Sequence, residues 1–186
     1  MLFPLVVGLG NPGPEYDSTR HNFGFMVLNR WAAADGGVWR AAGFANARLA
    51  RLTSGVRLLQ PLDYMNCSGA AVGAALGWFK LAPRQALVVV DDVNLPLGHL
   101  RLRAGGSSGG HNGLKSVEAA LGTQEYARLR GGVGGADGDL VGHVLGRFAG
   151  GEREILEQMI IRAIEVLRCC QSQGLAPAAA KIKNET

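Results

Sequence analysis

The sequence has few cysteines and no long apolar run. Its 186 residues include three cysteines, Cys67, Cys169 and Cys170, none of which has the C-x-x-C spacing. An odd count without metal-ligand spacing predicts neither a disulfide framework nor a zinc site, and it is typical of a reduced, cytoplasmic protein. No run of about 18 apolar residues is present, so we expect no membrane span. The N-terminal residues lack the basic region of a secretion signal.

Charge of either sign is sparse as well. Charged residues make up 18% of the chain and hydrophobic residues 47%, which excludes an intrinsically disordered chain and allows a sizeable core. The length predicts a single domain over residues 1–186. The formal net charge is +4. This modest positive charge is compatible with a nucleic-acid partner but does not require one.

Glycine, in contrast, is abundant, with 28 copies. The glycines cluster between apolar segments, at residues 8–13, 105–113 and 131–138. Their spacing is not periodic, so neither a collagen helix nor a repeat array is predicted. Such clusters are typical of places where the backbone turns tightly or approaches a ligand.

Apolar patterning predicts the order of secondary structure. Alternation and short apolar runs predict strands at residues 2–7, 44–53, 56–60, 86–90, 99–103 and 127–133, with a further strand-like piece at 141–145. Helical spacing predicts helices at residues 22–35, 69–80 with Ser68 as cap, 112–121 with Asn112 as cap, and 152–173, followed by a loose tail over 175–186. Strands that alternate with helices predict an α/β fold, a single-domain sandwich with a central mixed β-sheet packed between helices.

Polar residues at the ends of the predicted strands indicate where a site would form. Asn11 follows the first strand and Asp91 ends a buried one, and ligands of such folds bind at the carboxyl ends of the strands. His21 precedes the first helix, where a histidine is usually a surface or capping residue. A carboxylate that accepts a proton from one imidazole nitrogen leaves the other nitrogen free as a base. We therefore predict that His21 and Asp91 meet.

Three asparagines lie in short turns at the predicted site. Asn11, Asn66 and Asn112 lie in the turns Gly-Asn-Pro-Gly, Met-Asn-Cys-Ser-Gly and Gly-His-Asn-Gly, a setting in which asparagine is commonly only a turn or cap residue. Together they offer hydrogen-bond donors and acceptors without charge, which suits a peptide ester and the oxyanion formed when it is attacked.

Two glycine motifs have alternative interpretations. Residues 8–13 match G-x-G-x-x-G, but Pro12 and Pro14 delay the helix and no acid ends the second strand, which argues against a dinucleotide site. Residues 106–110 match G-x-S-x-G around Ser108. With Asp137 or Asp139 and His143 they keep the chain order of an α/β-hydrolase triad. No strong strand leads into Ser108, so we favour a glycine loop near a ligand over a serine nucleophile.

Taken together, the motifs resemble those of bacterial peptidyl-tRNA hydrolases, in the same order from residue 5 to about residue 148. The matching segments are residues 7–13 (Val-Gly-Leu-Gly-Asn-Pro-Gly) with Glu15-Tyr16, 19–22 (Thr-Arg-His-Asn), 64–69 (Tyr-Met-Asn-Cys-Ser-Gly), 91–92 (Asp-Asp), 95–98 (Leu-Pro-Leu-Gly), 109–116 (Gly-Gly-His-Asn-Gly-Leu-Lys-Ser), 128–130 (Arg-Leu-Arg) and 142–146 (Gly-His-Val-Leu-Gly). Several separate motifs in register are far more specific than any one of them.

The resemblance implies a monomeric, metal-free and cofactor-free esterase. Its substrate would be peptidyl-tRNA released prematurely from ribosomes, cut at the ester bond between the peptide and the 3′ end of the tRNA. His21 would be the general base that activates water, Asp91 would orient it, and Asn11 would complete the catalytic group. Residues that position the peptide and the tRNA would be Tyr16, Tyr64, Met65, Asn66, His111, Asn112, Arg103 and Arg130.

Two positions depart from the family pattern. Arg103, which with Arg130 would clamp the terminal phosphate of the tRNA, stands where a lysine is common, and arginine also holds phosphate. Without the resemblance, both arginines are typical of a solvated strand face. Gly131 stands where the family often has isoleucine, which predicts a strand weakened by up to ~1 kcal/mol.

An RNA-binding module of the same fold is the main rival to an enzyme, because some relatives of this fold serve RNA splicing and a basic chain suits that role equally. Retention of His21, Asp91 and the three asparagines favours the enzyme, since binding alone would not require them.

Overall fold

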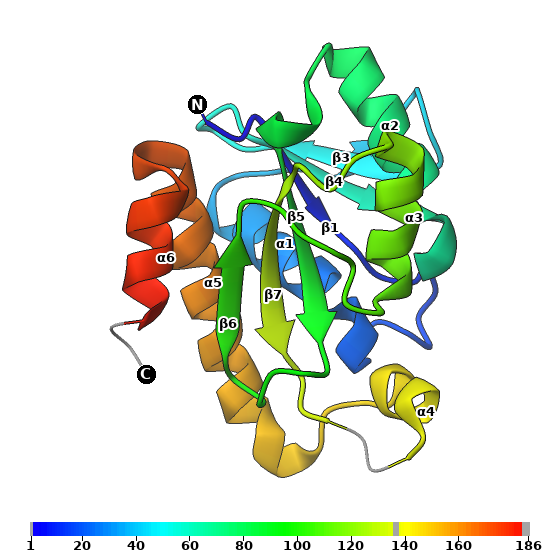
Figure 1. Ribbon diagram of the computed structural model, residues 1–186, viewed down its shortest axis with the longest axis vertical. Helices are drawn as coiled ribbons and strands as arrows, with labels where there is room; N and C mark the ends of the chain where they lie inside the picture. The colour runs from blue at the N-terminus through cyan, green and yellow to red at the C-terminus, as the bar shows by residue number, and fades with distance from the viewer. Residues whose placement is uncertain (1, 136–137, 184–186) are drawn as a thin grey trace.

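The computed structural model describes residues 2–135 and 138–183. Its centre is a seven-stranded sheet in the order β2-β3-β4-β1-β5-β7-β6 (Figure 1). The inner strands β4, β1, β5 and β7 are parallel, whereas β2, β3 and β6 run antiparallel to their neighbours, so the predicted mixed sheet is confirmed. The strands are β1 (Leu5–Gly8), β2 (Arg40–Ala41), β3 (Ala47–Arg51), β4 (Arg57–Pro61), β5 (Ala86–Asp92), β6 (Leu100–Arg103) and β7 (Ala127–Gly132).

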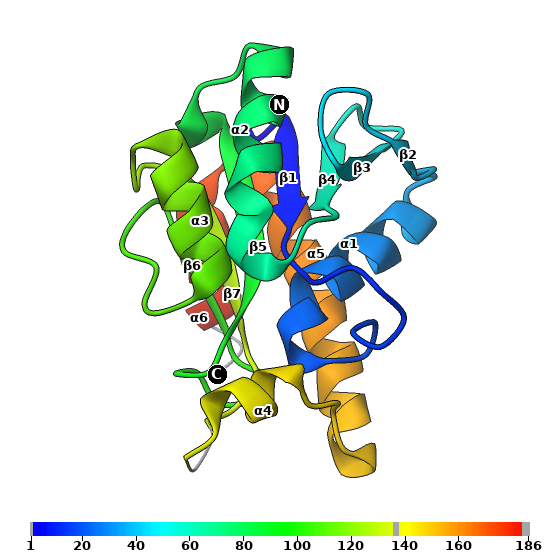
Figure 2. The ribbon, with the colours of Figure 1, turned by 90° about the vertical axis from the view of Figure 1, so that its right-hand side faces the viewer.

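Helices cover both faces of the sheet (Figure 2). One face packs against α1, α5 and α6, and the other packs against α2 and α3, which gives the predicted single-domain sandwich. The helices are α1 (Phe23–Ala34), α2 (Ser68–Phe79), α3 (Asn112–Leu121), α4 (Leu140–Leu145), α5 (Arg153–Gln173) and α6 (Leu175–Lys183), with 3-10 turns η1 (Arg20–Asn22), η2 (Met65–Cys67), η3 (Pro83–Gln85) and η4 (Gly150–Glu152). None of the helices in the described ranges combines the length and apolarity needed to cross a membrane.

Strand β5 has apolar side chains on both faces because helices cover both. Leu87 and Val89 belong to the core under α1 and α5, whereas Val88 and Val90 belong to the core under α2 and α3. A central parallel strand therefore carries a continuous apolar run instead of an alternating one. The run ends at Asp91, at the edge of the sheet beside α4 in Figure 1.

Two glycines let α1 cross closely over β1. A Cβ on Gly8 would overlap the backbone carbonyl of Gly24 in α1, and a Cβ on Gly24 would lie 2.6 Å from the backbone nitrogen of Leu9. Part of the glycine pattern at residues 8–13 therefore serves helix-on-strand packing, which brings η1 to the carboxyl end of β1.

Two expected irregular segments are helical. Residues 141–145, predicted as strand-like, lie in α4, because the side chain of Asp139 accepts a hydrogen bond from the backbone nitrogen of Gly142 at 2.9 Å and caps the helix. The tail predicted to be loose instead forms α6, because Ala178 is buried against the core of α1 and α5. Residues 184–186 of that tail lie outside the described residues.

Two predicted helix caps were also wrong. Ser68 is the first residue of α2, and its hydroxyl donates to the carbonyl of Met65 at 2.9 Å instead of accepting from the helix. Asn112 is the first residue of α3, and the side chain of His111 is the cap. The two-residue edge strand β2 was not predicted, because its residues carry no apolar alternation.

Gly131 in β7 lies against an aromatic ring. A Cβ at this position would overlap the ring of Phe23, which is fully buried. The aromatic ring occupies the space that a larger side chain at this position would need, so its packing accompanies the glycine that is predicted to loosen the strand.

We therefore expect Gly131→Ala to destabilise the protein by about 1–3 kcal/mol through overpacking. Gly43→Ala is the matched control, because a Cβ there meets nothing within 4 Å, and its effect should stay within about 0.5 kcal/mol. Urea unfolding measures both, and adding Phe23→Leu should recover part of the loss at position 131. A Gly131→Ala variant as stable as the wild type would contradict this packing.

Candidate active site

A cavity of about 220 Å³ lies at the carboxyl ends of the parallel strands, beside the end of β5. Three larger surface hollows, of about 780, 700 and 640 Å³, lie along α5 and contain neither His21 nor Asp91. We place the site in the smaller cavity because buried polar side chains converge there. It is lined by His21, Asp91, Asp92, Val93, Asn94, Gly109, Gly110, His111, Asn112, Arg130, Leu140, Val141 and Val144.

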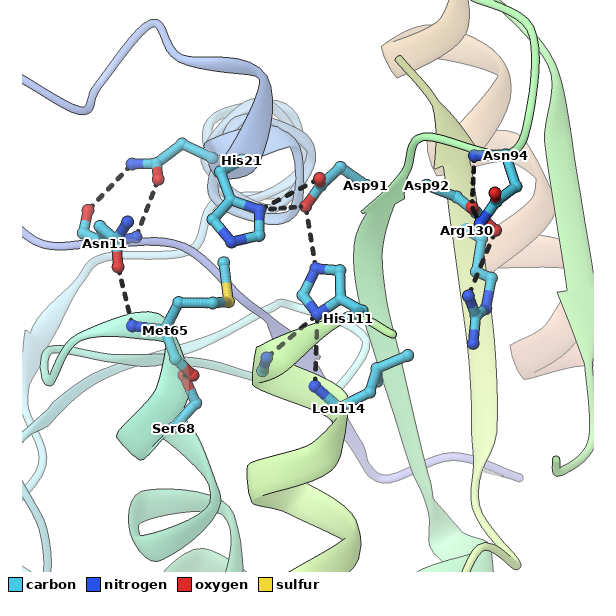
Figure 3. Close-up of polar contacts among 12 residues, drawn as sticks. Asn11, His21, Met65, Ser68, Asp91, Asp92, Asn94, His111, Leu114 and Arg130 are labelled. Carbon is cyan, nitrogen blue, oxygen red and sulfur yellow. Dashed lines mark hydrogen bonds and ion pairs between the residues drawn. The ribbon is translucent and has the colours of Figure 1, made fainter. Parts of the chain in front are cut away.

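His21 and Asp91 are in contact, as predicted. The Nδ1 atom of His21 lies 2.9 and 3.1 Å from the two carboxylate oxygens of Asp91 (Figure 3). Strand β5 brings the carboxylate to the edge of the sheet, and η1 brings the imidazole. The side chain of Asp91 is 1% exposed and that of His21 is 11% exposed. This contact leaves Nε2 of His21 without a protein hydrogen-bond partner among the described residues.

His111 is a second imidazole on the same carboxylate. Its Nε2 atom lies 3.0 Å from Oδ1 of Asp91. Its Nδ1 atom accepts from the backbone nitrogens of Gly113 and Leu114 at 3.1 and 3.3 Å, so the side chain caps α3. The sequence predicted a substrate contact for His111. The sequence did carry a signal for the cap, because His111 directly precedes the predicted helix. The cap had been assigned to Asn112 instead.

The carboxylate of Asp91 stays ionised. Burial on its own would raise the pKa of Asp91, but the charge attraction and hydrogen bond of His111, together with those of His21, hold the pKa of that carboxyl well below its usual range. A buried carboxylate between two imidazoles is therefore a fixed negative charge at the end of β5.

The same three side chains are the group among the described residues that could surround a metal ion. The ligand atoms of His21, Asp91 and His111 all lie within 4.8 Å of one another. Each imidazole already directs a ring nitrogen to Asp91 as a hydrogen-bond partner. The cluster is complete as a hydrogen-bonded unit.

Three hydrogen bonds hold Asn11 in place. Its Oδ1 atom accepts from the backbone nitrogen of Met65 at 2.7 Å. Its own backbone is held by Asn22, whose Oδ1 accepts from the nitrogen at 2.8 Å and whose Nδ2 donates to the carbonyl oxygen at 2.9 Å (Figure 3). Asn22 is fully buried and was missed as a site residue, because beside His21 it looks like an ordinary helix cap. The arrangement leaves Nδ2 of Asn11 as the free donor of that side chain.

Of the other predicted peptide-binding residues, one lines the cavity and four do not: Asn112 lines it, in contrast to Tyr16, Tyr64, Met65 and Asn66. Tyr16 and Tyr64 pack edge to face with ring centroids 6.5 Å apart, and Tyr64 is 60% exposed. Met65 is buried, whereas Asn66 is exposed on η2. Asn112 is the first residue of α3.

The two predicted clamp arginines have different environments. Arg130 is buried, pairs with Asp92 at 3.2 Å, donates to the carbonyl of Ser107 at 2.8 Å and lines the cavity. Arg103 is exposed on the edge strand β6 and does not line it. The antiparallel register pairs Arg101 with Arg130, so Arg103 is a diagonal neighbour of Arg130 on the same face. The solvated-face interpretation therefore fits Arg103 and is wrong for Arg130.

Several residues that line the cavity were missed. Leu140, Val141 and Val144 reach it from α4, which the sequence predicted as a strand. Asn94 also lines it and donates its backbone nitrogen to Asp92 at 2.9 Å.

The serine-hydrolase arrangement is not assembled in the described residues. Asp137 lies outside them. Asp139 caps α4, and Nε2 of His143 lies 3.1 Å from the carbonyl of Val133. Neither side chain has a hydrogen bond to Ser108 in the described part of the chain.

With this geometry in place, the chain was compared with known proteins. A family model described as peptidyl-tRNA hydrolase matches residues 5–186. The chain belongs to the peptidyl-tRNA hydrolase family. A peptidyl-tRNA hydrolase of Synechococcus sp. (strain JA-2-3B'a(2-13)) is 50% identical over 186 residues, covering 94% of this chain and 80% of the relative. One from Synechocystis sp. (strain ATCC 27184 / PCC 6803 / Kazusa) is 44% identical, with coverage of 99% and 97%.

Solved structures agree with the fold of this family. A crystal structure of peptidyl-tRNA hydrolase from Acinetobacter baumannii matches with a TM-score of 0.91 at 32% identity, covering 98% of this chain and 96% of that chain. The architecture predicted from the alternation of strands and helices is thus that of a peptidyl-tRNA hydrolase.

The lowered pKa of Asp91 has a consequence for acid stability. A carboxyl whose folded pKa lies below its unfolded value, about 3.9 for aspartate, stabilises the fold above that value and loses this contribution as the pH falls toward the folded pKa. Between about pH 4 and pH 2, the urea midpoint of the wild type should therefore fall more steeply than that of Asp91→Asn. The exposed Asp17→Asn variant is the control and should follow the wild type; parallel curves for all three proteins would contradict the assignment.

Proposed function

We propose that the protein hydrolyses the ester bond between a peptide, or an N-blocked aminoacyl group, and the 3′ end of tRNA, with His21 as the general base. The observation that carries the proposal is the contact of 2.9 Å between Nδ1 of His21 and Asp91, in a chain of the peptidyl-tRNA hydrolase family. It leaves Nε2 of a cavity-lining imidazole free to take a proton.

In the proposed reaction, water attacks the ester carbonyl carbon while its proton passes to Nε2 of His21. The tetrahedral intermediate then breaks its bond to the ribose oxygen, and the imidazolium returns the proton to that leaving oxygen. The products are a peptide with a free carboxyl group and a tRNA with a free hydroxyl. The ionised Asp91 stabilises the transient imidazolium and holds the ring in place, as a buried carboxylate does in hydrolytic triads.

Asn11 is the residue that we assign to the oxyanion. Its Oδ1 atom is held by the backbone of Met65, and Asn22 holds its backbone, so its Nδ2 group is a preorganised neutral donor. A donor fixed before the reaction stabilises developing negative charge without reorganising. Asn66 and Asn112 would then contact the peptide and the tRNA terminus.

The terminal phosphate of the tRNA would bind to the basic face of β6 and β7. Arg130 is held in place by Asp92, whereas Arg103 on the same face is free to move toward a phosphate. We further propose that the protein acts as a metal-independent monomer in the cytoplasm. The family membership and the three free cysteines support this setting.

Turnover of N-acetylated aminoacyl-tRNA tests the proposal, with free aminoacyl-tRNA as the substrate that should not be cut. We expect His21→Ala to lower kcat by about 10²–10⁴-fold, the usual contribution of a general base, and to leave the urea midpoint unchanged. Asp91→Ala should leave slower but measurable turnover.

The control for these variants is His99→Ala, an exposed histidine outside the cavity, which should keep full activity. A nearly fully active His21→Ala variant would end the proposed mechanism. A wild type that binds tRNA without any turnover would favour an RNA-binding module, and labelling of Ser108 by a fluorophosphonate would revive the serine hydrolase.

The two clamp arginines should differ in one respect. Arg103→Ala and Arg130→Ala should both raise KM and reduce the salt dependence of tRNA binding by about one unit of slope per lost phosphate contact. Only Arg130→Ala should also lower stability, by about 3–5 kcal/mol, because it leaves buried Asp92 without its cation. Arg51→Ala, an exposed arginine at the other end of the sheet, is the control. An unchanged KM for both variants would count against the clamp.

A further inference from the structure

His111 has no polar atom left for a substrate. Although its ring lines the cavity, Nε2 faces Asp91 at 3.0 Å and Nδ1 faces the backbone nitrogens of Gly113 and Leu114 (Figure 3). Its side chain is 7% exposed. Contact with the substrate through hydrogen bonds would require breaking one of these interactions, which argues for a role inside the protein.

The partners of His111 also determine where its proton lies. Backbone nitrogens can only donate, so Nδ1 must accept from Gly113 and Leu114 and cannot itself carry a hydrogen. A neutral imidazole then has its hydrogen on Nε2, which donates to the carboxylate of Asp91. One tautomer therefore satisfies every contact of the ring.

We propose that His111 is a positioning residue, locked as the neutral Nε2–H tautomer by the start of α3, and that it directs Asp91 toward His21. The catalytic part of this inference rests on the proposed function. The carboxylate accepts from His111 at Oδ1 and from Nδ1–H of His21 across both oxygens. His21 is thereby kept with its lone pair on Nε2, the atom that takes the proton from water.

The hydrogen bonds of the cap oppose protonation of His111, although the ionised carboxylate of Asp91, 3.0 Å from Nε2, attracts positive charge on the ring. A second hydrogen, on Nδ1, would point at two backbone N–H groups and add positive charge at the N-terminus of a ten-residue helix, which is its positive end. The ionisable groups around the ring are His21 from η1, Asp91 from β5, and the ion pair of Asp92 with Arg130 across the same cavity. Along α3 itself the next is Lys115, also a cation.

Of the two imidazoles, His21 therefore binds and releases the proton of the reaction. In the proposed reaction the cluster therefore contains one base, His21, and one imidazole that supports it.

The hydrogen bonds that fix the tautomer of His111 also disfavour binding of a metal ion to the three side chains. Two histidines and a carboxylate within 4.8 Å have the composition of a divalent transition-metal site. A histidine that binds a metal normally donates the hydrogen of its other ring nitrogen to an acceptor. In His111 that other nitrogen faces two donors, so binding of zinc through Nε2 would abolish the cap of α3. We expect equimolar Zn²⁺ to leave activity unchanged.

Nitrogen-15 NMR of the imidazole rings tests the lock without using activity. In the wild type between about pH 7 and pH 8, His111 should have an unprotonated Nδ1 and a protonated Nε2, whereas His21 should carry its hydrogen on Nδ1. The variants His111→Asn and His21→Ala assign the resonances. A protonated Nδ1 on His111 at any of these pH values, or a Zn²⁺-induced shift of its Nε2 resonance together with inhibition, would overturn the proposal.

Two substitutions test the positioning role. Asparagine at position 111 offers a cap acceptor but is too short to reach Asp91, so His111→Asn should keep its urea midpoint and lose about tenfold to a hundredfold in kcat, as is usual when an orienting hydrogen bond is removed, with KM unchanged. His111→Gln reaches further and should recover part of kcat. A raised KM with unchanged kcat would make His111 a substrate-binding residue and refute the proposal, as would full activity of His111→Asn.

The two hypotheses fail separately. If His21→Ala stays active, the proposed mechanism fails. The NMR result still decides whether His111 is held as the Nε2–H tautomer. If His21→Ala is inactive but His111→Asn has wild-type kcat, the lock has no catalytic role and the proposed function stands.

Discussion

The structure depends on one buried charge, the carboxylate of Asp91. An ionised carboxyl that is 1% exposed would be strongly destabilising unless it were paired and hydrogen-bonded. Two imidazoles supply its partners, one from η1 and one from the start of α3. Because both partners are histidines, the carboxylate is satisfied without a permanent positive charge beside it, and one of the two rings keeps a nitrogen that can take a proton.

The fold brings these groups together by the geometry of parallel strands. Neighbouring strands β1 and β5 end at the same edge, which puts Asn11 and Asp91 on adjacent segments. Glycine at positions 8 and 24 lets α1 pack directly on β1, so that η1 carries His21 to the same edge. Helix α3 points its N-terminus at Asp91 through the His111 cap. The core on both sides of the sheet therefore determines the distances within the site.

Much of the fold, and the pair at its site, could be predicted from the sequence. Asp91 directly ends a buried apolar run, a signal that is local in the chain and fixes its place at the edge of the sheet. The role of His111 could not be predicted, since it depends on which backbone groups face each ring nitrogen. Helix α4 was missed because six residues rich in valine and leucine fit a strand as well, until the Asp139 cap is known. Arg103 and Arg130 occur in similar Arg-Leu-Arg segments, and only the order of strands makes one exposed and the other buried.

The cation that lines the cavity pairs with Asp92 and not with Asp91. Arg130 is the arginine that lines the cavity, and its charge is taken up by Asp92, the next residue along β5. Asn112, which lines the cavity, and Asn11, which we propose for the oxyanion, are neutral amides. An unpaired arginine beside Asp91 would compete with His21 for the carboxylate and weaken its hold on the imidazole. Because Asp92 pairs with the arginine, Asp91 keeps its hydrogen bonds to the two imidazoles, as the proposed role of His21 requires.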